Sequence, residues 1–163
     1  MNIWFFVILL VAIALVIGPV SMLRPRPAQR RKEALRLHAT KQGVRFGWRK
    51  PPKLKTDMEE PEPAPVYYLA PTSQILVKPG WILMRTSYEH DGNFYGAWDW
   101  HGEYRPNETI QEILRNHVPE LPESVTLISQ GEAGTCIFWA EKEDKDVLDR
   151  LITLLKMLQA AEE

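Results

Sequence analysis

Hydrophobic residues are distributed very unevenly along this chain, and the longest apolar run lies at its start. Residues 1–23 carry no charged side chain, and only Gly18 and Pro19 would disturb a helix there. A helix of this length spans roughly 27 to 31 Å, which matches the hydrocarbon core of a bilayer. The pattern predicts a transmembrane anchor over residues 1–23, with apolar side chains that include Ile3, Trp4, Phe5, Leu9, Leu15 and Val20.

Period-two patterns in the second half of the chain predict two β-hairpins. Residues 81–89 and 94–100 flank the turn signal Asp91-Gly92, so paired residue numbers should add to 183. A second hairpin is predicted for residues 125–130 and 135–141, where 136–140 are apolar on both faces, as in a central strand. The core-facing side of the first hairpin would carry Trp81, Leu83, Arg85, Trp98 and Trp100, with Arg85 stacked on Trp98.

Helical spacing follows each hairpin. Asn107 is placed as the N-cap of a helix that Pro119 and Pro122 close, and residues 144–161 have a broad apolar side. Shorter strands are predicted for residues 44–48, 66–70 and 75–78. The order of hairpin, helix, hairpin, helix predicts an α+β domain, an antiparallel sheet packed against two helices, after the single transmembrane helix.

The segment between the anchor and this domain divides in two. Residues 28–42 are good helix formers with many basic side chains, and Gly43 is placed to end that helix. This helix either lies at the lipid interface or forms an exposed stalk. Residues 50–65 contain five prolines and predict a linker. The expected organisation is an anchor (1–23), a basic juxtamembrane helix (24–43), a short strand with a proline-rich linker (44–65) and a cytoplasmic α+β domain (66–163).

Charge is separated along the chain. Residues 24–55 hold twelve Lys or Arg and one acid, Glu33, whereas residues 56–163 hold eight basic and twenty acidic residues. Positive flanks remain on the cytoplasmic side, so we expect a membrane protein with its N-terminus outside and its domain cytoplasmic. The basic flank should contact anionic lipid head groups through Arg24, Arg26, Arg30, Arg31 and Lys32.

The N-terminal arrangement also resembles a known family. An apolar span followed by Leu23-Arg24-Pro25 and by Arg30-Arg31-Lys32-Glu33 is similar to the YajC family, the small auxiliary subunit of the bacterial Sec preprotein translocase. The resemblance covers about 30 of the 163 residues. It implies a bacterial inner-membrane location and, more distantly, a role in protein translocation.

Candidate chemistry is sparse. Asp99, His101 and Glu103 alternate with other residues and would share one strand face, where they could bind a divalent cation or simply face water. Cys136 lies in an apolar run typical of a small core residue. The HExxH, CxxC and GxSxG motifs are absent, and no cofactor or small-molecule substrate is predicted. An acidic domain also argues against nucleic-acid binding.

Two functional hypotheses follow. The first is a non-enzymatic accessory or scaffolding subunit of a membrane complex, with protein translocation as one candidate process and another membrane protein or complex as its partner. Its docking surface would include Trp81, Trp98 and Trp100 unless these side chains form the core. The alternative is a small membrane-tethered enzyme or metal-binding module that uses Asp99, His101 and Glu103.

Overall fold

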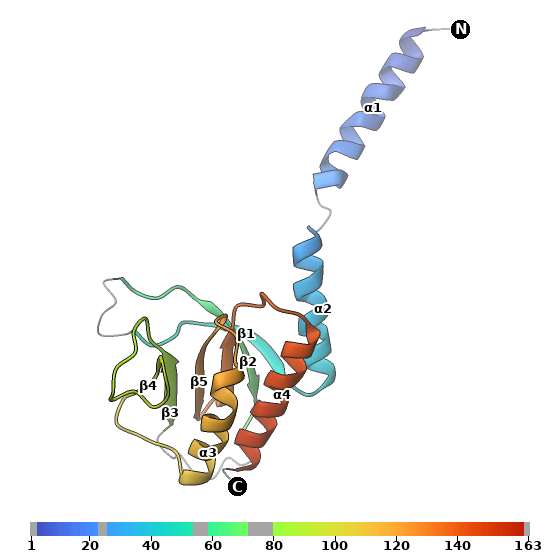
Figure 1. Cartoon of the computed structure of the whole chain (residues 1–163). Helices are drawn as coiled ribbons and strands as arrows, with labels where there is room; N and C mark the ends of the chain where they lie inside the picture. Colours follow the sequence, from blue (N-terminus) through green and yellow to red (C-terminus); the bar gives the residue numbers. More distant parts are fainter. Residues whose placement is uncertain (1–2, 23–25, 54–58, 72–79, 162–163) are drawn as a thin grey trace. The chain divides into compact units, whose positions relative to one another are not determined.

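The computed structural model of this protein describes residues 3–22, 26–53, 59–71 and 80–161, with side chains described for all of these except residues 18–22. The chain forms two compact units, Met1–Ala34 and Leu35–Glu163. Helix α1 (Ile3–Met22) lies in the first unit, and helix α2 (Pro27–Lys41) begins there and ends in the second. The second unit also holds a β-sheet and two further helices, α3 and α4 (Figure 1).

The transmembrane part of the predicted fold is corrected by the structure. Among the residues that the structure describes, none of the helices combines the length and the apolar composition needed to cross a membrane. The prediction of a single-pass transmembrane anchor over residues 1–23 is therefore wrong.

In the part of the chain that the structure describes, the second unit has an α+β fold built on one antiparallel sheet of six strands. The strands are β1 (Arg45–Arg49), β2 (Ala64–Leu69), β3 (Trp81–Arg85), β4 (Trp98–His101), β5 (Val125–Gly131) and β6 (Gly134–Trp139). Their order across the sheet is β1-β2-β6-β5-β3-β4. Strand β6 lies inside the sheet and every one of its residues is buried, as its continuous apolar sequence predicts.

The register of the β3–β4 pair confirms the predicted pairing in the part of the hairpin far from the turn. Leu83 pairs with Trp100 and Arg85 with Trp98, so partner numbers add to 183. The ladder ends at Arg85, however, so the predicted pairing farther along, up to residues 89 and 94, does not form. The Thr86 N–H still donates to the carbonyl of Ala97 at 2.7 Å, but Tyr95 and Trp98 then exchange backbone hydrogen bonds at 3.1 and 2.8 Å, which turns the chain back before it can pair farther with β3. Asn93 Nδ2 donates to the carbonyl of Gly96 at 2.6 Å within this turn region.

Helices α3 (Glu108–His117) and α4 (Lys145–Ala160) cover one face of the sheet, and a 3₁₀ turn, η1 (Val118–Glu120), follows α3 (Figure 1). Each helix begins at a side-chain cap: Asn107 accepts from the N–H of Ile110, and Asp144 accepts from the N–H of Val147. The apolar side of α4 is buried as predicted, through Leu148, Leu151, Ile152, Leu154, Leu155 and Leu158.

The C-terminal half of α2 belongs to the α+β unit. Leu35 and Ala39 are 5% and 0% exposed and contribute to the main hydrophobic core. The helix ends at Lys41, and Gly43, two residues later, has a φ of +84°, the left-handed conformation expected of a terminating glycine. These two apolar side chains therefore pack against protein, which neither the lipid-interface interpretation nor the exposed-stalk interpretation anticipated.

The compact α+β unit begins before residue 66, where the sequence placed the start of the folded domain. Strand β1, the short strand predicted at residues 44–48, pairs with β2 and is part of the main sheet. A linker therefore separates two neighbouring strands of one sheet. Residues 54–58 of the predicted linker and the strand predicted at residues 75–78 lie outside the described residues.

Candidate functional site

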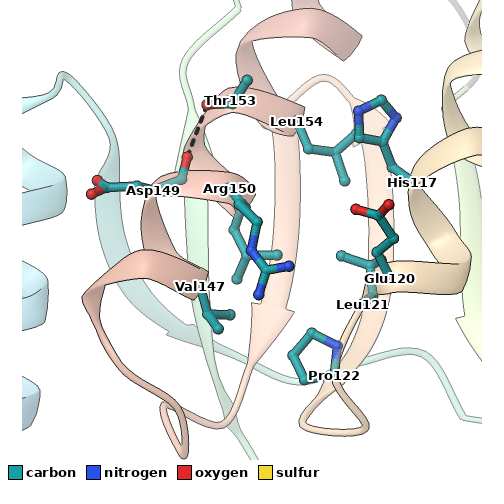
Figure 2. Close-up of a pocket in the computed structure, with 10 residues that line it drawn as sticks. His117, Glu120, Leu121, Pro122, Val147, Asp149, Arg150, Thr153 and Leu154 are labelled. Atoms are coloured by element: carbon teal, nitrogen blue, oxygen red, sulfur yellow. Dashed lines mark hydrogen bonds between the residues drawn. The ribbon is translucent and has the colours of Figure 1, made fainter.

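A cavity of about 340 Å³ lies between the α3–η1 segment and α4. One wall consists of His117, Glu120, Leu121 and Pro122, and α4 supplies the other. Figure 2 shows Leu121, Pro122 and Val147 at its apolar end. The wall from α4 is lined by Val147, Asp149, Arg150, Leu151, Thr153 and Leu154.

Two opposite charges face each other across this cavity. Glu120 projects from the η1 side and Arg150 from α4, and both side chains point into the space between the walls (Figure 2). Among the described residues, neither forms an ion pair with a protein group. An apolar cavity with one carboxylate and one guanidinium on opposite walls can bind an amphipathic group that carries charge at its edge.

Hydrogen bonds from one arginine hold the η1 wall of the cavity in place. On the η1 side, Arg85 donates to the carbonyls of Leu121 (3.2 Å), Pro122 (3.0 Å) and Val125 (3.1 Å). Burial lowers the pKa of the Arg85 guanidinium, while the charge of Glu123 acts in the opposite direction. The Arg85 guanidinium also stacks on Trp98 at 4.8 Å, which confirms the predicted cation–π contact.

Helix α2 contacts the far side of the α4 wall. Asp149 Oδ1 lies 2.6 Å from His38 Nε2 and accepts from Gln42 Nε2 at 3.2 Å. The Asp149 carboxylate is therefore already occupied by groups of the protein. The charged groups that remain to receive a ligand are Glu120 and Arg150.

The cavity lacks the geometry of a nucleophilic active site. His117 Nδ1 bonds the carbonyl of Ile113 at 2.8 Å, and the Thr153 hydroxyl donates to the carbonyl of Asp149 at 2.9 Å (dashed line in Figure 2). The single hydroxyl of the lining thus hydrogen-bonds the backbone and is not aligned with a base. The arrangement suits binding better than catalysis.

The candidate metal residues lie elsewhere, on the opposite face of the sheet. Asp99 pairs with Met84 and His101 with Ile82, both of which pack in the smaller core cluster of that face. Strand β4 ends at His101, so Glu103 is exposed beyond it. Within the described ranges, no group of three His, Cys, Asp or Glu side chains has a spacing that could hold a metal ion.

The tryptophans considered for a docking surface are mostly in the core. Trp81 and Trp98 are 5% and 3% exposed, and Trp81 Nε1 donates to Gln130 Oε1 at 3.0 Å. Trp100 is half-buried and packs edge-on against Phe94, with ring centroids 4.8 Å apart. These indoles stabilise the base of the first hairpin, and only Trp100 retains surface for a partner.

Cys136 is a buried core residue. It packs with Val66, Leu127 and Phe138, and Arg49 Nη1 donates to its sulfur at 3.3 Å. Burial raises the pKa of the thiol, which Arg49 only partly offsets. A buried, protonated thiol is a poor nucleophile.

The structure describes most, but not all, of the residues that were predicted to contact lipid. In α1, Ile3 and Trp4 are each 77% exposed and Leu15 is 70% exposed; Phe5 and Leu9 are also exposed. The side chain of Val20 and all of Arg24 lie outside the described residues. Among the basic side chains, Arg26, Arg30 and Arg31 are exposed and Lys32 is half-buried.

A buried polar network beside β1 was missed at the level of sequence. Glu141, whose side chain is fully buried, accepts from Arg36 Nε and Nη2 at 2.7 Å each and from the Tyr67 hydroxyl at 2.8 Å. Burial raises the pKa of Tyr67, and the Glu141 carboxylate raises it further. No signal in the sequence identified this network, because its members come from α2, β2 and the loop after β6.

The cavity was likewise missed, because nothing in the sequence distinguished His117, Glu120 or Arg150 from other helical positions. Comparison with known proteins adds no homologue: no protein-family model, curated protein or solved structure matches this chain.

Proposed function

We propose that this protein is a non-enzymatic accessory or scaffolding subunit of a larger assembly. The observation that carries the proposal is the surface of α1. From Ile3 to Ile17 its large apolar side chains are exposed by 45% or more. Apolar surface of this extent marks a site of association, because isolated soluble domains rarely expose it.

The distribution of charge suggests what surrounds the two units. Arg26, Arg30 and Arg31 are exposed close to the apolar helix along the chain, and anionic lipid head groups attract such side chains. The acidic α+β unit would be repelled by the same lipids and is available to a protein partner. We therefore propose an anionic lipid surface as one partner, and the cytoplasmic face of the bacterial inner membrane as the location.

A role in protein translocation is a narrower proposal that rests on the N-terminal resemblance to the YajC family alone. The alternative hypothesis, an enzyme or metal-binding module based on Asp99, His101 and Glu103, receives no support from the placement of these residues. The α3–α4 cavity has binding character, which is compatible with a scaffolding subunit.

Crosslinking of the full-length protein in cells, followed by purification and mass spectrometry, tests the proposal. The same proteins should be recovered in independent repeats, and the double substitution L9E/L15E should reduce their recovery at least about ten-fold, because it places charge on the apolar surface of α1. Lys156→Glu, an exposed substitution on α4, is the control. Failure to recover any reproducible partner would contradict the accessory role.

A further inference from the structure

Strand β1 is an edge strand, since β2 is its only strand neighbour among the described residues. In an antiparallel pair, alternate residues exchange backbone hydrogen bonds with the neighbouring strand, and the residues between them direct their N–H and C=O groups away. The outer side of β1 therefore presents backbone donors and acceptors without a strand partner in the described structure. Such an edge can accept a strand from another chain.

The two faces of β1 differ in chemistry because side chains alternate along a strand. Phe46 and Trp48 lie on one face, and Phe46 packs edge-on against Tyr67 with ring centroids 5.4 Å apart. Trp48 is 59% exposed, although a tryptophan in a folded unit is usually well buried. Phe46 is half-buried, and the Arg36 guanidinium lies 4.0 Å from its ring centre, so this face offers an exposed indole beside a partly covered ring.

The other face of β1 is cationic. Arg45 is exposed, and no described residue forms an ion pair with it. Arg49 is held more tightly, with its guanidinium 4.4 Å from the centre of the Tyr68 ring. Gly47 lies between the two arginines and leaves room above the strand, since a Cβ there would meet nothing closer than 3.7 Å.

Charge decides against a second copy of the same chain as the occupant. Antiparallel pairing of two β1 strands centred on Gly47 would set Arg45 of each directly opposite Arg49 of the other. Like charges directly opposite one another destabilise a strand pair. An acidic strand has the complementary charge and relieves this repulsion.

We propose that β1 binds an extended acidic segment of another protein by strand addition. The segment places acidic residues opposite Arg45 and Arg49 and apolar residues opposite Phe46 and Trp48, in the order acid, apolar, any residue, apolar, acid. This inference rests on the proposed function, because it supplies the surface by which a scaffolding subunit holds its partner.

Fluorescence anisotropy with the labelled peptide TEVTVET tests the proposal on the full-length protein, kept in solution by a mild detergent because α1 exposes apolar side chains. Trp48→Ala should weaken binding at least about ten-fold, because exposed tryptophans at interfaces are frequent hot spots. Arg45→Glu should weaken binding of TEVTVET about ten-fold and strengthen binding of the charge-swapped peptide TKVTVKT. The exposed substitution Lys156→Glu should change neither.

The backbone ladder is tested separately by N-methylation. Only alternate backbone amides of the bound peptide TEVTVET face β1. Methyl groups on that set of amides should therefore abolish binding, whereas methyl groups on the other set should be tolerated. Amide resonances of residues 45–49 should shift on binding. The proposal is overturned if about 1 mM TEVTVET does not bind, if both methylated sets bind equally, or if β1 instead mediates self-association in sedimentation experiments.

These outcomes separate the two proposals. Crosslinked partners that attach through α1 alone, together with absent peptide binding, would keep the accessory function and remove the β1 site. Peptide binding with no partner recovered from cells would support the β1 site and remove the accessory function.

Discussion

Glu141 and Glu143 lie two residues apart and anchor opposite parts of the α+β unit. Glu141 has a φ of +57°, a left-handed conformation uncommon for a residue with a side chain. Its buried carboxylate binds Arg36 from α2 and Tyr67 from β2, so the unusual backbone directs a charge that joins the helix to the sheet. A buried charge is stable only with such partners.

Glu143 makes stability depend on pH. Burial acts to raise its pKa, but hydrogen bonds from Ser124 Oγ (2.5 Å) and Trp139 Nε1 (2.6 Å) outweigh burial and lower the pKa below the usual value for a glutamate. A carboxyl with a lowered folded-state pKa stabilises the protein above its unfolded-state pKa, and this contribution is lost as pH falls through the folded value. Glu143→Gln should therefore reduce the free energy of unfolding by about 1–2 kcal/mol near pH 7.

Chemical denaturation of both proteins across the acidic range measures this effect. The difference between wild type and Glu143→Gln should shrink as pH falls from the unfolded-state pKa of the carboxyl through its lowered folded-state pKa, because Glu143 then becomes neutral like glutamine. Glu132→Gln, the same substitution at an exposed position in the β5–β6 turn, should change stability little at any pH. A difference that stayed constant down to about pH 3 would show that Glu143 does not act through its charge.

At the scale of elements, the β5–β6 hairpin depends on a glycine, Gly134, that lies very close to the backbone of strand β2. Gly134 begins β6 with a φ of +86°, and a Cβ built there would lie 1.8 Å from the carbonyl oxygen of Leu69 at the end of β2. The hairpin turn and the β2–β6 pairing thus require glycine at the same position. The sequence shows the turn but not the close approach of β2.

Gly134→Ala should destabilise the protein by about 3 kcal/mol or more, because overpacking against backbone adds to the cost of the left-handed conformation. Gly43→Ala is the matched control, since Gly43 has a φ of +84° and a Cβ added there would meet no atom within 4 Å. It should cost only about 1 kcal/mol. Thermal unfolding of the two variants measures the difference, and equal losses would rule out the steric contribution at Gly134.

Hairpins and capped helices were the elements most accessible from sequence. Asp91-Gly92 and the aromatic runs around it predicted the pairing of Leu83 with Trp100, and Asn107 predicted the start of α3. The extent of the first hairpin was overestimated, because Tyr95 and Trp98 exchange backbone hydrogen bonds with each other and Asn93 hydrogen-bonds the backbone of Gly96. Local propensity does not reveal which of these competing hydrogen bonds forms.

For the molecule as a whole, charge separation leads to a prediction about lipid binding. If exposed basic residues near the apolar helix contact anionic lipid, each should contribute about 1 kcal/mol near the surface. The double substitution R30E/R31E should therefore weaken partitioning of the full-length protein onto phosphatidylglycerol-containing vesicles by at least about thirty-fold at low salt.

Vesicle co-sedimentation provides the measurement, with uncharged phosphatidylcholine vesicles and the Lys156→Glu variant as controls. Partitioning should rise with the anionic lipid fraction and decline with salt. Equal partitioning onto charged and uncharged vesicles, or no effect of R30E/R31E, would contradict an electrostatic contact with lipid.

Sequence by itself determined the features of this protein that arise from neighbouring residues: the α+β class, the two hairpins, the caps of α3 and α4, the glycine that ends α2 and the separation of basic from acidic segments. Tertiary structure decided which surfaces these elements bury. It placed Leu35 and Ala39 of a basic helix in the core, joined Arg36 to Glu141, made β1 an edge of the main sheet and opened a cavity between Glu120 and Arg150. The physical reason is that hydrogen bonding and periodicity act locally along the chain, whereas burial and charge pairing depend on residues that only folding brings together.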